Sequence, residues 1–218
     1  MSCLPDPAKD FDTYRERVAP LAPGSSGGSG DAATFDSAPP TEASQGFYYG
    51  ACLSQLAFGR VDRVFNFLAE TSFTPDAAGG KLTLKLTSLK LSFEPPAPPL
   101  GLPPKTVSKA GTSGPVQGNA DPAAIDATGR FSLDLGRVTV PGDANPLTGR
   151  DVVIEATKLV GRFSKERFCA RLNGNVTQPV TLTLDPPQNV CQFVLVKDGD
   201  ATPIFTDQSS FAPETCPE

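Results

Sequence analysis

Five cysteines are the residues of this chain with the clearest potential for chemistry, because the sequence contains no histidine. Histidine is the commonest general base and metal ligand in proteins, so its absence excludes Ser–His–Asp and Cys–His catalysis. No cysteine lies within four residues of another, which excludes the closely spaced thiolates of a zinc site. The cysteines therefore indicate disulfide formation, and the sequence predicts no cofactor.

Four of the cysteines can form two disulfides: Cys52, Cys169, Cys191 and Cys216. Cys169 and Cys191 flank a predicted hairpin, so we predict the pair Cys169–Cys191. The remaining pair, Cys52–Cys216, would tie the C-terminal tail to the first strand and constrain the unfolded chain. Other connectivities are open to four cysteines, and reduced thiols are the alternative. Disulfides would place the protein in an oxidising compartment.

The fifth cysteine, Cys3, follows the small residue Ser2 and precedes Leu4-Pro5-Asp6-Pro7, which can begin a polar tether. In these two residues and the tether, the chain resembles a mature bacterial lipoprotein, whose signal peptide is removed just before a cysteine that carries the lipid. The resemblance implies lipid attachment at Cys3 and a position at the bacterial outer membrane or cell surface. The alternative is a surface cysteine without a special role.

Carboxylates are the other candidates for catalysis, because two of them suffice for glycoside hydrolysis. The candidates are Glu70, Glu94, Asp134 and Glu155, but nothing in their spacing singles out a pair. Glu70 and Asp134 fall opposite the strongest apolar rows of their strands, where a solvated sheet face carries its charges.

Asp143, Asn145 and Asp151 lie around a predicted turn, and Asp198 and Asp200 frame another. Calcium needs oxygen ligands clustered on loops. The same residue types also stabilise turns, because Asn and Asp side chains hydrogen-bond their own backbone. Turn formation is the favoured interpretation, and we predict no metal.

The aromatic residues comprise 14 Phe and three Tyr, with no Trp. Phenylalanine belongs in a core, and flat amphipathic rings for sugar stacking are scarce. The Phe and Leu side chains can build an ordinary packed core or line an apolar cavity. A net charge of −5 without a basic patch argues against nucleic-acid binding, and no run of 18 apolar residues can span a bilayer.

The chain divides at about residue 45 into a tether and a single β-domain, 46–218. Residues 5–19 predict a short helix, with Asp6 as N-cap and Pro7 at the first helical position. Residues 23–44 are rich in Gly, Ser and Pro, which is typical of a flexible linker.

Alternating apolar residues and turn signals predict about eight strands in the β-domain. Phe65, Phe67, Ala69, Thr71 and Phe73 share one strand face. The apolar phase slips between Leu82-Leu84-Leu86 and Leu89-Leu91-Phe93, so we expect a bulge near Thr87-Ser88, and Gly136 marks a second bulge. We expect strands at 47–53, 61–73, 81–93, 131–140, 151–163, 168–176, 180–184, 190–196 and 204–205, with one near Val116 inside the proline-rich connection 94–128.

This pattern predicts an all-β fold, as an antiparallel β-sandwich or a partly closed barrel. We expect a non-enzymatic, lipid-anchored envelope domain with a binding or structural role and a protein partner at the envelope. One alternative is a carrier of an apolar ligand in a barrel cavity. Another is a histidine-free hydrolase with a carboxylate pair.

Overall fold

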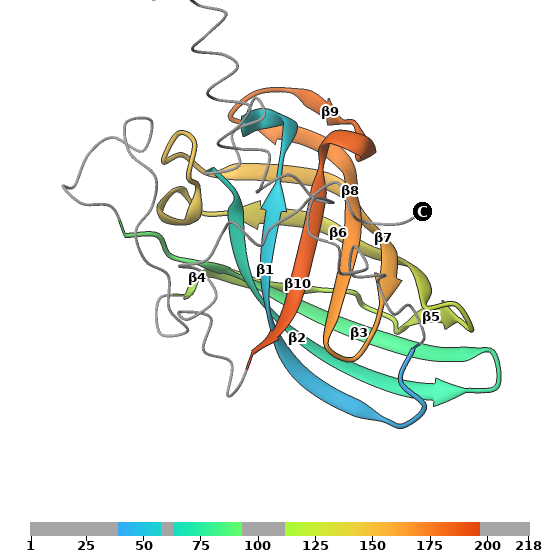
Figure 1. Cartoon of the computed structure of the whole chain (residues 1–218). Helices are drawn as coiled ribbons and strands as arrows, with labels where there is room; N and C mark the ends of the chain where they lie inside the picture. The colour runs from blue at the N-terminus through green and yellow to red at the C-terminus, as the bar shows by residue number, and fades with distance from the viewer. Residues whose placement is uncertain (1–38, 58–62, 93–111, 197–218) are drawn as a thin grey trace, which may run out of the picture. The chain divides into compact units, whose positions relative to one another are not determined.

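The computed structural model describes residues 39–57, 63–92 and 112–196. Within these ranges the regular structure consists of ten β-strands and three short 3₁₀ turns (Figure 1). The predicted all-β class is confirmed. The elements are β1 (Ser44–Leu53), η2 (Gln55–Ala57), β2 (Phe65–Asp76), β3 (Gly79–Leu89), β4 (Thr112–Gly118), β5 (Ala123–Asp126), β6 (Arg130–Val140), η4 (Gly142–Ala144), β7 (Val152–Phe163), β8 (Arg167–Gln178), β9 (Leu182–Leu184), η5 (Pro186–Gln188) and β10 (Val190–Val196).

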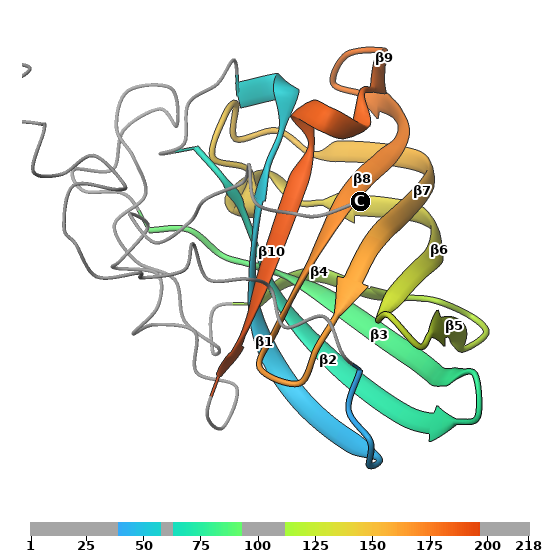
Figure 2. The ribbon, with the colours of Figure 1, turned by 45° about the vertical axis from the view of Figure 1, so that its right-hand side comes forward.

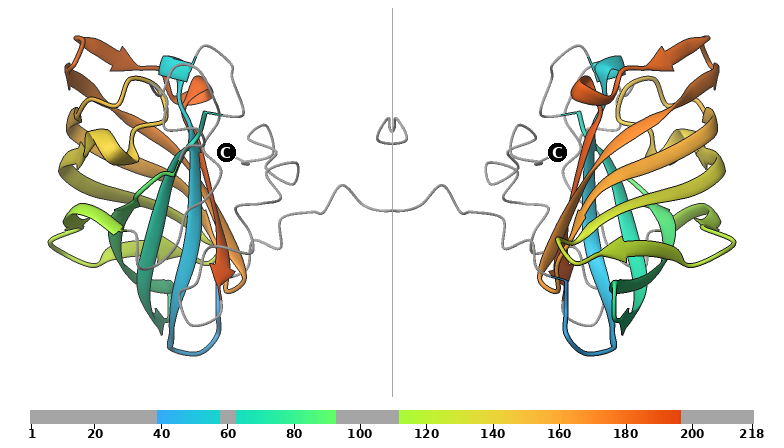
Figure 3. Two further views of the ribbon diagram at one scale, coloured as in Figure 1. Left: turned by 90° about the vertical axis from the view of Figure 1, so that its left-hand side faces the viewer. Right: turned by 90° about the vertical axis from the view of Figure 1, so that its right-hand side faces the viewer.

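Antiparallel pairing closes eight of the strands into a barrel. The order around the barrel is β10, β1, β2, β3, β5, β6, β7 and β8, and β8 pairs back onto β10. Figure 2 shows β10 between β1 and β8, and Figure 3 shows β6, β7 and β8 on the wall opposite β1 and β2. The structure is therefore a closed barrel with two extra strands, β4 and β9, and the sandwich alternative was wrong.

Aromatic side chains fill one end of the barrel interior, near the turn between β7 and β8. The Phe168 and Phe193 rings stack with centroids 4.1 Å apart, and Tyr48 meets Phe168 edge-on at 5.1 Å. The Tyr48 hydroxyl donates a hydrogen bond of 2.7 Å to the carbonyl oxygen of Lys165 in that turn. Phenylalanine thus packs this end as a core. The rings in this layer are those of Tyr48, Phe73, Phe131, Phe163, Phe168 and Phe193.

The bulge predicted near Thr87-Ser88 is present in β3, but it does not repair the apolar slip. A register shift does lie between Leu86 and Ser88, but only in the pairing with β4. Along β2 the register is unbroken, so Ser88 stays opposite the inward-facing Phe67 and Leu89 turns outward. The outward position suits Leu89 because the outer wall carries an apolar cluster of its own, which buries Leu89 completely. The members of this outer cluster are Tyr49, Ala51, Val64, Leu68, Leu89, Leu91 and Val196, with Phe47 and Leu53 packed against it.

β4 and β5 act as two halves of one interrupted strand beside β3. Leu89↔Thr112 begins the pairing with β4, and Leu82↔Ala123 to Gly79↔Asp126 continue it with β5 in the same direction. The strand expected near Val116 is therefore confirmed as β4. The sequence analysis missed β5, because the four residues Ala123–Asp126 show no alternation of apolar and polar side chains.

Bulges bend the pairing between β6 and β7, as predicted at Gly136. Gly136 has a φ of +63° at the register shift, a backbone conformation in which glycine is favoured. The pairing of β7 with β8 is regular at Gly161, and its register shifts lie between Val153 and Ile154 and between Glu155 and Lys158. At Gly161 a side chain is excluded by close packing, because a Cβ atom would lie 1.9 Å from the Cys169 carbonyl oxygen.

Several predicted segments lie outside the described residues. They are the helix over 5–19, most of the linker 23–44 and the strand at 204–205.

Candidate functional site

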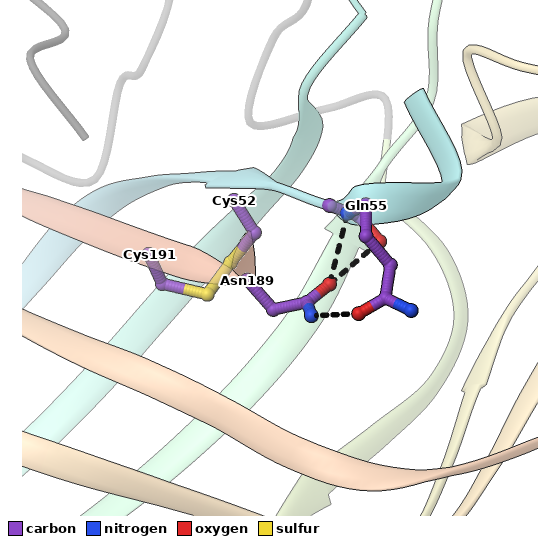
Figure 4. The surroundings of a disulfide bond; sticks show 5 residues. Cys52, Gln55, Asn189 and Cys191 are labelled. Atoms are coloured by element: carbon purple, nitrogen blue, oxygen red, sulfur yellow. Dashed lines mark hydrogen bonds between the residues drawn. A yellow bond between two sulfur atoms is a disulfide. The ribbon is translucent and has the colours of Figure 1, made fainter. Parts of the chain in front are cut away.

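Cys52 and Cys191 form a disulfide between β1 and β10 (Figure 4). The two residues stand directly opposite one another in the strand pair, with Cα atoms 4.0 Å apart. Both sulfurs face the barrel interior, where the two cysteines line a cavity. The bond therefore links the first and last strands of the barrel at the place where the ring closes.

Both predicted disulfide pairs are wrong, although Cys52 and Cys191 do form a disulfide. Cys169 stands opposite Gln192, and Cys191 stands opposite Ala170. Because side chains alternate along a strand, this one-residue offset turns Cys191 inward and Cys169 outward. The predicted hairpin partners are therefore neighbours on opposite faces of the wall.

Cys169 is buried on the outer face of β8 and is also disulfide-bonded. Its partner is neither Cys52 nor Cys191, since these are bonded to each other. The two other predicted cysteine positions, Cys216 and the lipid-attachment candidate Cys3, lie outside the described residues.

An apolar cavity of about 40 Å³ occupies the barrel interior between the aromatic layer and the end that carries η2 and β9. Its walls come from β1, β2, β3, β6, β7, β8, β9, β10 and η2, and nearly all atoms that face it are apolar. Ser54 and Thr157 are the only lining residues with a hydroxyl group. Both hydroxyls donate hydrogen bonds within the protein: Ser54 to Oδ1 of Asn189 at 2.9 Å, and Thr157 to the Ile154 carbonyl at 3.1 Å.

No charged side chain lines the cavity. It therefore offers neither a proton donor nor a base to a bound molecule. An apolar group that enters it would exchange water for hydrocarbon contacts, which is favourable in proportion to the area buried.

A hydrogen-bonded cap closes the barrel beside the disulfide, and its centre is the completely buried Asn189 (Figure 4). The Asn189 side-chain nitrogen donates to Oε1 of Gln55 and to the Asp185 carbonyl oxygen, both at 2.7 Å. Its Oδ1 accepts from the Gln55 backbone N–H at 3.0 Å and from the Ser54 hydroxyl. The Gln55 side chain also accepts from the Asp185 N–H at 2.7 Å and donates to the Thr183 carbonyl at 3.3 Å. These bonds hold η2 against the β9–β10 connection.

Two lining residues, Leu56 and Leu172, are only half-buried, whereas the others are buried. Leu56 lies in η2 and Leu172 in β8, where the Leu172 N–H donates to the Asn189 carbonyl oxygen at 2.8 Å. The cavity lining is therefore exposed to solvent at these two side chains, beside the cap.

The predicted carboxylates do not line this cavity. Glu70 lies on the outer wall with its carboxylate 3.9 Å from the Lys85 ammonium. Asp134 accepts the Gly136 N–H at 2.8 Å, and Glu155 lies 3.4 Å from the Arg137 guanidinium. Each described acid of the predicted set is thus engaged at the surface, and Glu94 lies outside the described residues.

The calcium candidates stabilise the connection from β6 to β7. Asp143 accepts the Ser113 hydroxyl and lies 3.7 Å from the Lys90 ammonium. The buried Asn145 side chain binds the Thr148 hydroxyl at 2.9 Å and accepts the Leu147 N–H, and Asp151 accepts the Gly142 N–H at 2.8 Å. Within the ranges that the structure describes, no three Asp, Glu or Cys side chains gather as a metal site. Asp198 and Asp200 lie outside those ranges.

The sequence did not reveal the cap. Gln55 and Asn189 are 134 positions apart, and neither belongs to a motif.

No protein-family model matches the chain, and comparisons with curated proteins and with solved structures give no match. In the part of the chain that the structure covers, no helix has the length and apolar character needed to cross a membrane.

Proposed function

We propose that this chain is a non-enzymatic, extracytoplasmic binding domain built on a disulfide-closed barrel. The observation that carries the proposal is the Cys52–Cys191 bond across the β1–β10 pair. Disulfides persist in oxidising compartments and are rare where thiols are kept reduced. A bond between the two strands that close the ring suits a domain that holds its shape outside the cytosol.

Binding is favoured over catalysis by the placement of the polar groups. The cavity lacks charge, and its hydroxyls are occupied. The described acids of the predicted catalytic set lie on the outer wall, in ion pairs or at the Gly136 bulge. A general acid or base needs to reach a substrate in a site that binds it.

A lipid on Cys3 would hold the domain at the bacterial envelope, where we propose a protein partner. The experiment expresses the full precursor gene with radioactive palmitate and compares wild-type protein with Cys3→Ser. We expect label and membrane fractionation in wild type, and loss of both in the variant. Unlabelled wild-type protein would refute the anchor, and a cytosolic protein with a reduced Cys52–Cys191 pair would refute the extracytoplasmic assignment.

A second function, carriage of an apolar ligand, is favoured by the cavity itself. Eight-stranded barrels have an interior wide enough for one small ligand or for side chains alone. In this barrel the aromatic layer fills one end, and apolar side chains leave space at the other.

A further inference from the structure

We propose that the barrel cavity binds the end of an unbranched alkyl chain from an uncharged molecule, and that the chain enters beside the cap between Leu56 and Leu172. This inference rests on the second proposed function and names its ligand class. Three features of the barrel support it: the size of the cavity, its opening and the charge around the opening.

The size of the cavity selects a slender occupant. Its volume of about 40 Å³ exceeds the roughly 10–15 Å³ that a single water-sized group needs. It is well below the roughly 150 Å³ of a cavity known to take a benzene ring and the roughly 300 Å³ at which drug-sized pockets begin. A chain end fits such a space, whereas a ring or a branched group does not. Apolar cavities also stay dry, so a chain end would not have to displace bound water.

The opening determines the direction of binding. Leu56 and Leu172 are the half-buried members of the lining, so the wall meets solvent at these two apolar side chains. The aromatic layer closes the opposite end through the stacked Phe168 and Phe193 rings. A chain would therefore enter with its methyl end first and leave its polar head at the cap.

The cap disfavours an anionic head. Across 54–57 and 182–190, which form the cap, the only charged residue is Asp185, and it is exposed. The amide groups of Gln55 and Asn189 are already paired with each other and with the neighbouring backbone. Arg171, the residue before Leu172, has its side chain on the outer face of β8, because side chains alternate along the strand. Among these described residues, a carboxylate at the opening would therefore meet only a like charge, which is unfavourable. A hydroxyl head can remain hydrated there at no such cost.

The test is an NMR titration of the oxidised full chain, with 1-octanol and octanoate at pH 7 as probes. We expect saturable shifts of the Ile154 and Leu172 methyl signals with 1-octanol. Octanoate and a branched octanol should bind at least fivefold more weakly. Absence of saturable shifts up to the solubility limit of 1-octanol would overturn the site, and equal or tighter octanoate binding would overturn the preference for an uncharged head.

Leu56→Trp should block the opening and weaken 1-octanol binding at least tenfold. The matched control is Val116→Trp on β4, an exposed position outside the cavity, which should leave binding unchanged. If Leu56→Trp does not fold, Val140→Ile adds a methylene to the cavity wall and should weaken binding at least threefold. Binding that is insensitive to the folded cavity variant would overturn the proposed location.

Failure of this inference can be distinguished from failure of the first proposed function. A chain that carries the Cys52–Cys191 bond and the lipid label but binds no alkanol would remove the cavity ligand and leave the envelope binding domain in place. A chain that binds 1-octanol but is reduced and cytosolic would do the opposite.

Discussion

At the scale of single residues, the side-chain amide of Asn189 connects two segments that lie far apart in the chain. This amide bonds Ser54 and Gln55 at the start of η2, and it bonds Asp185 in the connection between β9 and β10. Removal of the amide would leave the buried Ser54 hydroxyl and the partly buried Gln55 groups without these partners. The hydrogen bonds thus decide where η2 lies over the cavity.

Asn189→Ala should lower the free energy of unfolding by about 2–3 kcal/mol, because it leaves buried polar groups without partners. Urea unfolding of the oxidised protein measures the change. The control is Gln188→Ala, since the Gln188 side chain bonds the exposed Asp185 carboxylate and its loss should cost below about 0.5 kcal/mol. Equal effects of the two substitutions would show that the cap does not stabilise the barrel.

Two buried tyrosines make stability fall at alkaline pH. Burial raises the pKa of both Tyr48 and Tyr49 above the ordinary value of 10.0, and the effect is larger at Tyr49, whose hydroxyl donates to Asn66 Oδ1 at 2.5 Å. The unfolded chain then loses its phenol protons first. Stability is therefore complete below about pH 10 and declines as the pH rises further, by about 1.4 kcal/mol per pH unit for each tyrosine that stays protonated.

Urea unfolding between pH 8 and pH 11 measures this decline, and phenolate absorbance follows ionisation directly. Tyr49→Phe should make the decline shallower, because the folded state then retains one buried phenol fewer. If both phenols ionise in the folded protein near pH 10, the burial argument is wrong.

At the scale of elements, the interrupted strand β4–β5 leaves a seam in the barrel that side-chain amides bridge. The Gln117 side chain donates to the Thr139 carbonyl at 3.0 Å and accepts the Thr139 N–H, in the place of a backbone pairing between β4 and β6. Asn119 lies in the interruption itself and bonds β3: it accepts the Leu84 N–H at 2.8 Å and donates to the Leu82 carbonyl at 3.1 Å. The barrel wall thus stays hydrogen-bonded where the strand breaks.

Gln117→Leu should destabilise the protein by about 1–3 kcal/mol, since it deprives both Thr139 backbone groups of their partner. Hydrogen exchange of the Thr139 amide should accelerate more than that of amides in β1 and β2. Val116→Ala, at a neighbouring exposed side chain, serves as the control and should change stability by below about 0.5 kcal/mol. An unchanged exchange rate at Thr139 would contradict the bridging role.

At the scale of the whole molecule, pairing of β1 with β10 joins segments far apart in the chain. Cys52 and Cys191 are 139 positions apart, so their bond closes a large loop of the unfolded chain. The chain-entropy account then gives a stabilisation of roughly 5 kcal/mol as its upper value. The disulfide therefore links the two strands whose pairing closes the barrel.

The variant Cys52→Ala/Cys191→Ala should lower the free energy of unfolding by about 3–5 kcal/mol, as measured by urea unfolding. Peptide mapping of the wild-type protein without reductant should recover Cys52 and Cys191 in one linked pair of peptides. Recovery of a Cys169–Cys191 pair, or a stability loss below about 1 kcal/mol in the variant, would contradict the structure.

The sequence by itself determined the all-β class, most strand positions and the inward face of β2. These features depend on residues close together in the chain, where apolar alternation and turn-forming residues act directly. The same local signals located β4 and the bulge at Gly136. These local signals failed at Leu89 in β3, because an outward-facing leucine is favourable only where other segments of the chain cover the outer wall.

Only the tertiary structure decided that the sheet closes into a barrel, that Cys52 pairs with Cys191, and that a cavity remains beside the Gln55–Asn189 cap. Each of these depends on register between strands more than a hundred residues apart. A shift of one residue turns every side chain to the opposite face, and a local pattern does not specify that register across a long separation.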